Sequence, residues 1–193
     1  MDISLIFIIV AVVAALLLFL LLRTYNRLVR MRNAVRNGWS DIDVQLTRRH
    51  DLVPNLVESV RGYMTHERET LEAVTRARSQ AIATSGGASL ATRAVAEMAL
   101  GGAVGNLFAV AEHYPTLKAS QQFLLLQEQL TSTENRIAYA RQYYNESVRQ
   151  YNTSLAEFPR NLVAGMMGFS PAALFAADEG ERILPQITAD ERR

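Results

Sequence analysis

The sequence contains no cysteine. Disulfide bonds, thiolate metal sites and thiol catalysis are therefore excluded, and the redox compartment is left open. Proline is scarce, with 5 residues in 193, and alternating runs of β-branched residues are few, which argues against a β-sheet. Positive and negative charges nearly balance at a formal net charge of +1, so the composition gives no support to a nucleic-acid-binding role.

A long apolar run occupies residues 3–22, with one polar side chain, Ser4, and no charge. Twenty helical residues at about 1.5 Å each span roughly 30 Å, the thickness of the hydrocarbon layer of a bilayer. A helix satisfies its own backbone hydrogen bonds in lipid, so we expect residues 1–23 to form a transmembrane anchor. The alternative is a cleaved signal peptide. The length of the run and Arg23 directly after it disfavour that alternative.

The flanks of the apolar run predict its orientation. Five arginines follow the run before the first acidic residue, Asp41: Arg23, Arg27, Arg30, Arg32 and Arg36. Clusters of arginine stay on the cytoplasmic side, so we expect the amino terminus outside and the rest of the chain inside. The same membrane-proximal basic residues either contact anionic lipid headgroups or act only as a topology signal.

The remaining 170 or so residues suit a single domain. Turn signals at 84–89, 113–116 and 158–159 divide it into three predicted helices. Pro54 lies inside the first of them and predicts a bend near His50 and Asp51, or a break with a restart. The expected parts are helices over about 24–83, 90–112 and 117–157 in a bundle spanning 24–158, an apolar C-terminal segment over 159–176, and a mobile tail over 177–193.

Apolar residues recur at alternating steps of three and four in the first and third predicted helices. This spacing predicts packing seams that close within one chain or between sister chains. The expected fold is all-α: a single N-terminal transmembrane helix followed by an elongated, antiparallel, coiled-coil-like helical bundle that forms a homo-oligomer. The glycine-rich middle helix is expected to pack tightly between the other two. The residues expected to carry packing and oligomer contacts are Val35, Trp39, Ile42, Leu46, Phe123, Leu130, Ile137 and Tyr144.

Candidate catalytic groups are few. His66 has no second histidine four residues later, as a zinc-protease helix needs, and we expect no metal or cofactor site. The run from His50 to Pro54 is similar to the phosphoacceptor of sensor histidine kinases, but no glycine-rich phosphate loop follows it. We therefore interpret residues 48–51 as a solvated, partner-facing patch, and we expect no catalytic residue and no enzymatic activity.

Two further patterns suggest contacts. Tyr144-Asn145 and Tyr151-Asn152 lie one heptad apart, either as core positions with bonded hydroxyls or as a buried polar layer that fixes helix register. An apolar, uncharged stretch over 161–169 has three possible uses: it docks on its own bundle, inserts shallowly in the membrane interface, or plugs a neighbouring subunit. The residues of this interaction patch are Leu162, Val163, Met166, Met167 and Phe169.

Several blocks in order along the chain resemble the LemA family. They are NGWSDIDVQL at 37–46, RRHDLVPNLV at 48–57, AEHYPTLKA at 111–119, TENRIAYAR at 133–141 and FPRNLVA at 158–164. Arg160 departs from the glycine expected in the last block. The resemblance implies a bacterial inner-membrane protein with one N-terminal membrane helix, a long helical bundle, a poorly defined role and no catalytic residues to carry over. Magnetosome-associated relatives, and relatives encoded beside membrane metalloproteases, suggest membrane organisation or envelope quality control.

We therefore expect a non-enzymatic, membrane-anchored helical scaffold that self-associates and organises or marks the membrane. The alternative is an adaptor or regulator of a membrane protease or other envelope protein. The expected partners are membrane lipid and further copies of the chain, with no nucleic acid.

Overall fold

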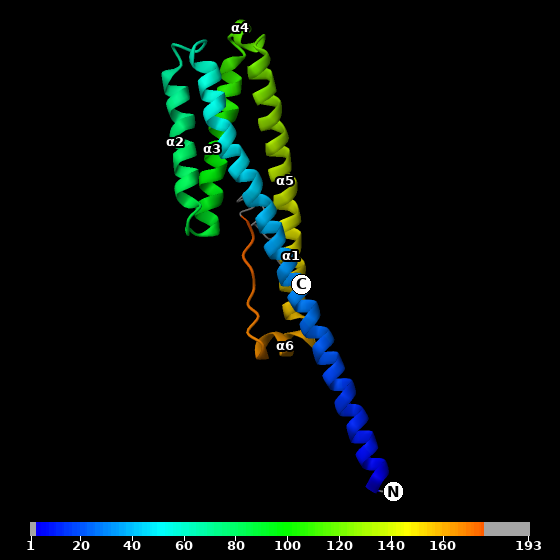
Figure 1. The fold of residues 1–193 in the computed structure, drawn as a ribbon. Helices are drawn as coiled ribbons and strands as arrows, with labels where there is room; N and C mark the ends of the chain where they lie inside the picture. The colour runs from blue at the N-terminus through cyan, green and yellow to red at the C-terminus, as the bar shows by residue number, and fades with distance from the viewer. Residues whose placement is uncertain (1–2, 176–193) are drawn as a thin grey trace, which may run out of the picture. The chain divides into compact units, whose positions relative to one another are not determined.

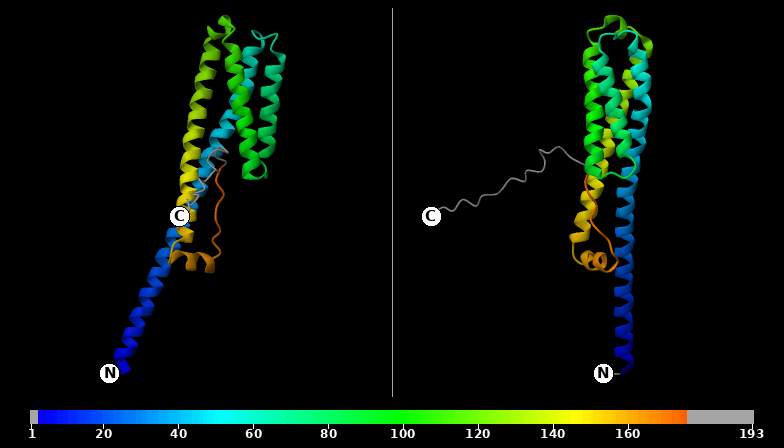
Figure 2. Two further views of the ribbon diagram at one scale, coloured as in Figure 1. Left: turned by 180° about the vertical axis from the view of Figure 1, so that it is seen from behind. Right: turned by 90° about the vertical axis from the view of Figure 1, so that its left-hand side faces the viewer.

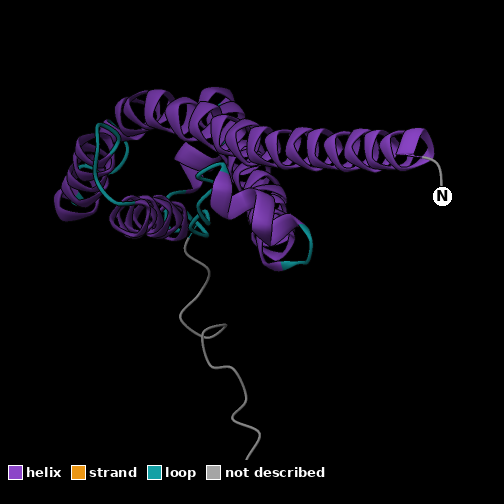
Figure 3. Ribbon diagram, turned by 90° about the horizontal axis from the view of Figure 1, so that it is seen from below, coloured by secondary structure: helices purple, strands orange, loops and turns teal. Residues whose placement is uncertain are grey.

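The computed structural model describes residues 3–175, which contain helices and loops and no strand (Figure 3). The helices are α1 (Ile3–Arg61), α2 (Arg68–Thr84), α3 (Leu90–Ala111), α4 (Pro115–Lys118), α5 (Gln121–Ala156) and α6 (Arg160–Met166) (Figure 1). They divide into two compact units. Unit 1 takes the chain up to Arg49 and residues 131–173, and unit 2 takes residues 50–130 and the chain from Leu174.

The N-terminal apolar run forms the first part of α1, a helix of 59 residues. Its most apolar window has a mean hydropathy of 3.5, and none of that window is buried within the chain. Exposed apolar side chains on every face suit lipid rather than water, so the all-α fold with an N-terminal membrane helix is confirmed. Helix α3 is also long and apolar enough to cross a membrane, but a third of its window is buried in unit 2.

In unit 1, α1 and α5 pack along the heptad seam. Val35, Ile42 and Leu46 of α1 are buried, as is Ile137 of α5. The ring of Trp39 meets the ring of Tyr144 edge to face, with 5.8 Å between centroids. Gly38 lies at the closest approach, because a methyl group there would come within 3.2 Å of the α5 backbone at Tyr144. The sequence pattern thus closes within one chain in this unit.

Unit 2 is a bundle that contains the whole of α2, α3 and α4, together with the last part of α1 and the first part of α5. One apolar core runs through it, from Val53, Leu56 and Val60 of α1 to Phe123 and Leu130 of α5. Helices α2 and α3 lie side by side (Figure 2). Helix α3 begins at a defined cap, because the side chain of Ser89 accepts a hydrogen bond from the backbone N–H of Thr92.

The single helix expected over 24–83 is wrong. Helix α1 ends at Arg61, and α2 begins only at Arg68. Gly62, a poor helix former, follows the end of α1, and Met64 is buried in the turn. The reversal brings buried Val74 of α2 into the same core as α1, which a continuous helix could not do.

Pro54 does not break α1, which is helical on both sides of it. The helix expected over 117–157 begins later, at Gln121 of α5, because residues 117 and 118 belong to the separate short helix α4, which carries Pro115 at its first position. The expected helix over 90–112 matches α3 closely. The tail expected over 177–193 lies outside the described residues.

Candidate functional site

The turn of α1 before Pro54 is held by a side chain from another helix. Proline has no N–H, so the carbonyl of His50, four residues earlier, loses its partner within the helix. Arg78 of α2 supplies a donor, because its Nε lies 2.7 Å from the His50 carbonyl oxygen. A charged N–H therefore stands where the helical N–H is missing, which explains why α1 continues through Pro54.

The side chain of His50 joins α1 to α3 at the same point. Its Nε2 lies 3.0 Å and 3.3 Å from the two carboxylate oxygens of Glu97, and both side chains are buried. An ionised carboxylate can only accept, so Nε2 is the donor in that state. Arg93, one turn before Glu97 on α3, is also buried. We call His50, Pro54, Arg78, Arg93 and Glu97 the Pro54 cluster.

The solvated patch expected over residues 48–51 is wrong in part. Arg48 and Asp51 are exposed, but Arg49 and His50 are buried. In unit 1, Nη1 of Arg49 lies 2.7 Å from a carboxylate oxygen of Glu134. Burial of these polar groups follows from partners on other helices that hydropathy does not reveal. Among the described residues, no group of three or more His, Asp or Glu is placed to hold a metal ion. The hydrogen bonds of the Pro54 cluster join α1 to α2 and to α3.

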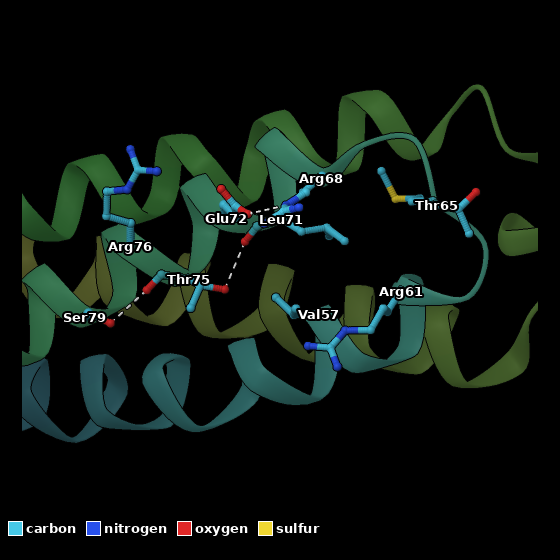
Figure 4. A pocket seen from close by; sticks show the side chains of 10 residues that line it. Val57, Arg61, Thr65, Arg68, Leu71, Glu72, Thr75, Arg76 and Ser79 are labelled. Carbon is cyan, nitrogen blue, oxygen red and sulfur yellow. Dashed lines mark hydrogen bonds and ion pairs between the residues drawn. The ribbon is translucent and has the colours of Figure 1, made fainter.

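A groove of about 590 Å³ lies between the end of α1 and α2 (Figure 4). Its floor is apolar, with Val57, Met64 and Leu71. Three arginines and one glutamate line it, and one of the arginines, Arg68, donates to Glu72 at 2.6 Å on the exposed side of α2. That contact lowers the pKa of the Glu72 carboxyl through its hydrogen bond and charge interaction with Arg68. The Thr and Ser hydroxyls of α2 donate back to backbone carbonyls of their own helix, and the lining residues contain no paired base and nucleophile.

Two tyrosines and an asparagine of α5 hold an extended segment of the same unit. We call residues 170–173 the strap. The hydroxyl of Tyr144 donates to the carbonyl of Ala173 at 2.8 Å, and that of Tyr151 donates to the carbonyl of Ser170 at 3.1 Å. Asn152 donates to the carbonyl of Ala172 and accepts from its N–H, both at 2.9 Å.

Burial raises the pKa of both strap-binding tyrosines, Tyr144 and Tyr151, although the charges of Arg32 and Arg36 oppose the shift at Tyr151. The Tyr–Asn pattern thus provides bonded hydroxyls in a buried setting, the first of the two readings of the sequence. The partners of these hydroxyls are backbone carbonyls of the strap and not groups on another helix, so helical periodicity does not reveal them.

The predicted interaction patch divides into two groups. Val163 is buried with Ala164 and Leu28 of α1, and the ring of Phe169 packs edge to face on Tyr25 at 5.8 Å. The other three patch residues, Leu162, Met166 and Met167, are exposed. Docking on the chain itself therefore accounts for only part of the patch.

Of the five arginines after the apolar run, four are exposed: Arg23, Arg27, Arg30 and Arg36. The fifth, Arg32, places its guanidinium carbon 5.0 Å from the centre of the Phe169 ring. This cation–π contact ties the basic segment to the chain that follows α6.

The residues predicted to carry packing and oligomer contacts lie inside the chain. Seven of the eight are buried and Trp39 is partly buried. Phe123 and Leu130 belong to the core of unit 2, and the other six lie in unit 1. A contact between copies needs a different surface.

Helix α3 offers such a surface, which the sequence reasoning missed. Its charged residues, Arg93 and Glu97, are both buried, whereas Val95 and Met98 are 61% and 48% exposed. The tight packing expected around its glycines is wrong for Gly102 and Gly105, which have open space around them. The exposed side of α3 therefore carries no charge. The sequence did carry a sign of this surface, because Arg93 and Glu97, the only charged residues in 90–111, are four residues apart and so share one helix face.

Comparison with known proteins identifies a family. The model of the LemA family matches residues 38–188. The chain belongs to the LemA family.

Three named relatives are similar to this LemA-family chain. "Magnetosome protein MamQ 2" of Paramagnetospirillum magneticum (strain AMB-1) is 27% identical, over 86% of this chain and 71% of the relative. "Protein LemA" of Metamycoplasma hominis is 28% identical, over 82% and 71%. "Magnetosome protein MamQ" of Magnetospirillum gryphiswaldense is 25% identical, over 86% and 71%. None of these is the name of an enzyme.

Proposed function

We propose that this LemA-family protein is a non-enzymatic scaffold, anchored in the bacterial inner membrane by α1, that associates with further copies of itself through the exposed face of α3. The observation that supports the proposal is the inverted charge pattern of α3. A helix on the surface of a water-soluble bundle normally places its charges outward. Helix α3 places Arg93 and Glu97 inward and leaves an uncharged outer face.

The spacing of the outer face suits another helix. Exposed or half-exposed residues follow alternating steps of four and three along α3, the pattern of a helix–helix seam. They are Ala91, Val95, Met98, Gly102, Gly105 and Ala109, which we call the α3 face. The two glycines at its centre allow a partner backbone to approach closely. A second copy offers the same uncharged face, so the two match across a two-fold axis.

The size of the α3 face fits a contact that depends on the membrane. A helix of 22 residues is about 33 Å long and about 10 Å wide, so it covers roughly 330 Å² on each partner. A stable interface between free proteins buries about 800 Å² per partner. Anchoring in one bilayer raises the effective concentration of the copies and offsets the small area. Self-association is therefore expected of the full chain in a membrane or membrane mimic.

A paired charge substitution tests the proposal. Val95→Glu together with Met98→Glu would place like charges in the contact, so the association constant should fall at least about tenfold, or about 1.4 kcal/mol. Ile82→Glu is the matched control, because Ile82 is exposed on α2 of the same unit. The mass of the full chain in gentle detergent, measured by light scattering over a range of concentrations, reports the change.

The proposed topology has the amino terminus outside and both units in the cytoplasm, as the arginines after the apolar run indicate. A chain that stays monomeric in nanodiscs at every concentration would refute self-association. Equal loss of association in Ile82→Glu would refute the role of the α3 face. Capture of a stoichiometric membrane protease by such a monomer would support the adaptor role in its place.

A further inference from the structure

Helix α6 packs against the part of α1 where the apolar run ends. Val163 and Ala164 of α6 are buried against Leu28 of α1, and Leu21 and Tyr25 pack against the same cluster. Leu21 belongs to the apolar run that ends at residue 22. All of these residues belong to unit 1. The packing therefore fixes α6 at the boundary of the membrane-spanning part of α1.

The position along α1 corresponds to the headgroup layer of a bilayer. Leu21 and Leu28 are seven residues apart, which is about 10 Å along a helix. The hydrocarbon core is about 30 Å thick and the whole bilayer about 40–45 Å, which leaves about 5–8 Å of headgroups on each side. An element packed between these two leucines lies at the depth of the headgroups and the adjoining acyl chains.

The side of α6 away from this packing is apolar and exposed. Leu162 and Met166 lie one turn apart on α6 and are 58% and 77% exposed, and Phe158 and Met167, which flank the helix, are 80% and 47% exposed. Arg160, the one charged residue between Phe158 and Met167, hydrogen-bonds to Ser154 and pairs with Glu157. Large exposed apolar side chains gathered in one short stretch of chain mark a contact with a partner or a membrane.

The orientation of α6 decides between these occupants. In Figures 1 and 2, α6 runs crosswise to α1 within unit 1. When α1 crosses a bilayer, α6 therefore lies near the plane of the interface, the position of interfacial helices that bury one face about 5–10 Å deep. The segment after α6 is held in place by Phe169 on Tyr25 and by the strap on α5, so α6 is fixed at this level before it meets lipid.

We propose that Phe158 and the exposed face of α6 insert into the lipid headgroup layer beside α1 and form a second membrane contact of this protein. The ligand is the bilayer surface itself. The inserted residues are Phe158, Leu162, Met166 and Met167. This contact fixes the tilt of unit 1 at the membrane, because the length of a single apolar helix does not specify a tilt angle. It does not depend on self-association through α3.

The absence of cysteine allows a direct test in the full chain. Leu162→Cys and Met166→Cys, each labelled with an environment-sensitive fluorophore, are reconstituted in vesicles of phosphatidylcholine and phosphatidylglycerol. Tyr139→Cys is the control, because Tyr139 is exposed on α5 of the same unit. Labels at 162 and 166 should be quenched several-fold more strongly by spin-labelled lipid than the label at 139, and should be shielded from a water-soluble quencher.

Two results with these labels would overturn the proposal. Labels at 162 and 166 that are as accessible to the aqueous quencher as the control would show that the face is in water. Labels shielded from water but not quenched by lipid would show that another protein surface covers the face.

As a second variant, Leu162→Glu should lower lipid quenching of a label at 166 several-fold while α1 keeps the chain in the vesicles and the far-UV spectrum is unchanged. Unaltered quenching would contradict the assignment.

Discussion

The hydrogen bond from Arg78 to the carbonyl of His50 should contribute to stability only because Pro54 has removed the helical donor. Arg78→Met keeps much of the side-chain volume and removes the donor. A hydrogen bond to a charged group contributes about 1.5–3 kcal/mol, so the variant should destabilise unit 2 by about that amount. Arg76→Met, on the exposed side of the same helix, should change stability by less than about 0.5 kcal/mol.

The replacement Pro54→Ala makes this prediction specific. Alanine at this position restores an N–H that bonds to the His50 carbonyl within the helix, so Arg78→Met should cost about 1–2 kcal/mol less in that background. Hydrogen exchange of the α2 and α3 amides in the full chain, followed by mass spectrometry, measures the opening free energy of unit 2. Each 1.4 kcal/mol corresponds to about a tenfold change in protection. If the two substitutions add within about 0.3–0.5 kcal/mol, Arg78 does not replace the missing donor.

Two further predictions concern the α1–α5 seam and the strap of unit 1. Gly38→Ala should destabilise the unit by about 1–3 kcal/mol, because the added methyl group meets Tyr143 and Tyr144 at 3.2 Å. Gly102→Ala, in open space on α3 of unit 2, should instead stabilise that helix by up to about 1 kcal/mol. Urea unfolding compares the two variants, and equal effects on stability would contradict the packing at Gly38. Burial raises the folded-state pKa of Tyr144 and Tyr151 above the unfolded value of 10.0, so their contribution is complete below pH 10 and is lost as the pH rises through the folded pKa. Tyrosinate absorbance at 295 nm should therefore show late-titrating groups, two of which disappear when Tyr144 and Tyr151 are replaced by Phe, and ordinary titration of both would contradict their burial.

Much of the fold could be predicted from the sequence because its signals are local. Twenty apolar residues without charge predict a membrane helix by length alone. The heptad stripes identified side chains that are buried, such as Ile42 and Ile137, because periodicity reports which face is apolar. The same stripes could not decide whether a seam closes within the chain or between chains.

The errors arose where a partner distant in sequence overrides a local rule. Pro54 suggested a bend or a break, but α1 stays helical through it, and Arg78, 24 residues later, donates to the carbonyl that proline leaves without a helical partner. His50 looked solvated, but Glu97 compensates its burial. The reversal after Arg61 was missed because the sequence marks it with a single glycine, Gly62, and with no proline.

The candidate contact surfaces were predictable only in part. The exposed face of α6 belongs to a stretch whose apolar composition is plain in the sequence, but its level beside Leu21 depends on the packing of Val163. The α3 face was not predicted, because the glycines of this helix were expected to pack tightly against neighbouring helices. Composition identifies small residues, whereas only the fold reveals whether a neighbour lies against them.

Disulfide formation between single cysteines along α3, in membranes that contain the full chain, tests self-association most directly. The chain has no cysteine of its own, so each variant reports one position. Positions 95, 98, 102 and 105 should give covalent dimers in a pattern that follows the exposed heptad, and Ile82→Cys on α2 should give few. Dimers no more abundant along α3 than at position 82 would contradict a scaffold built through this helix.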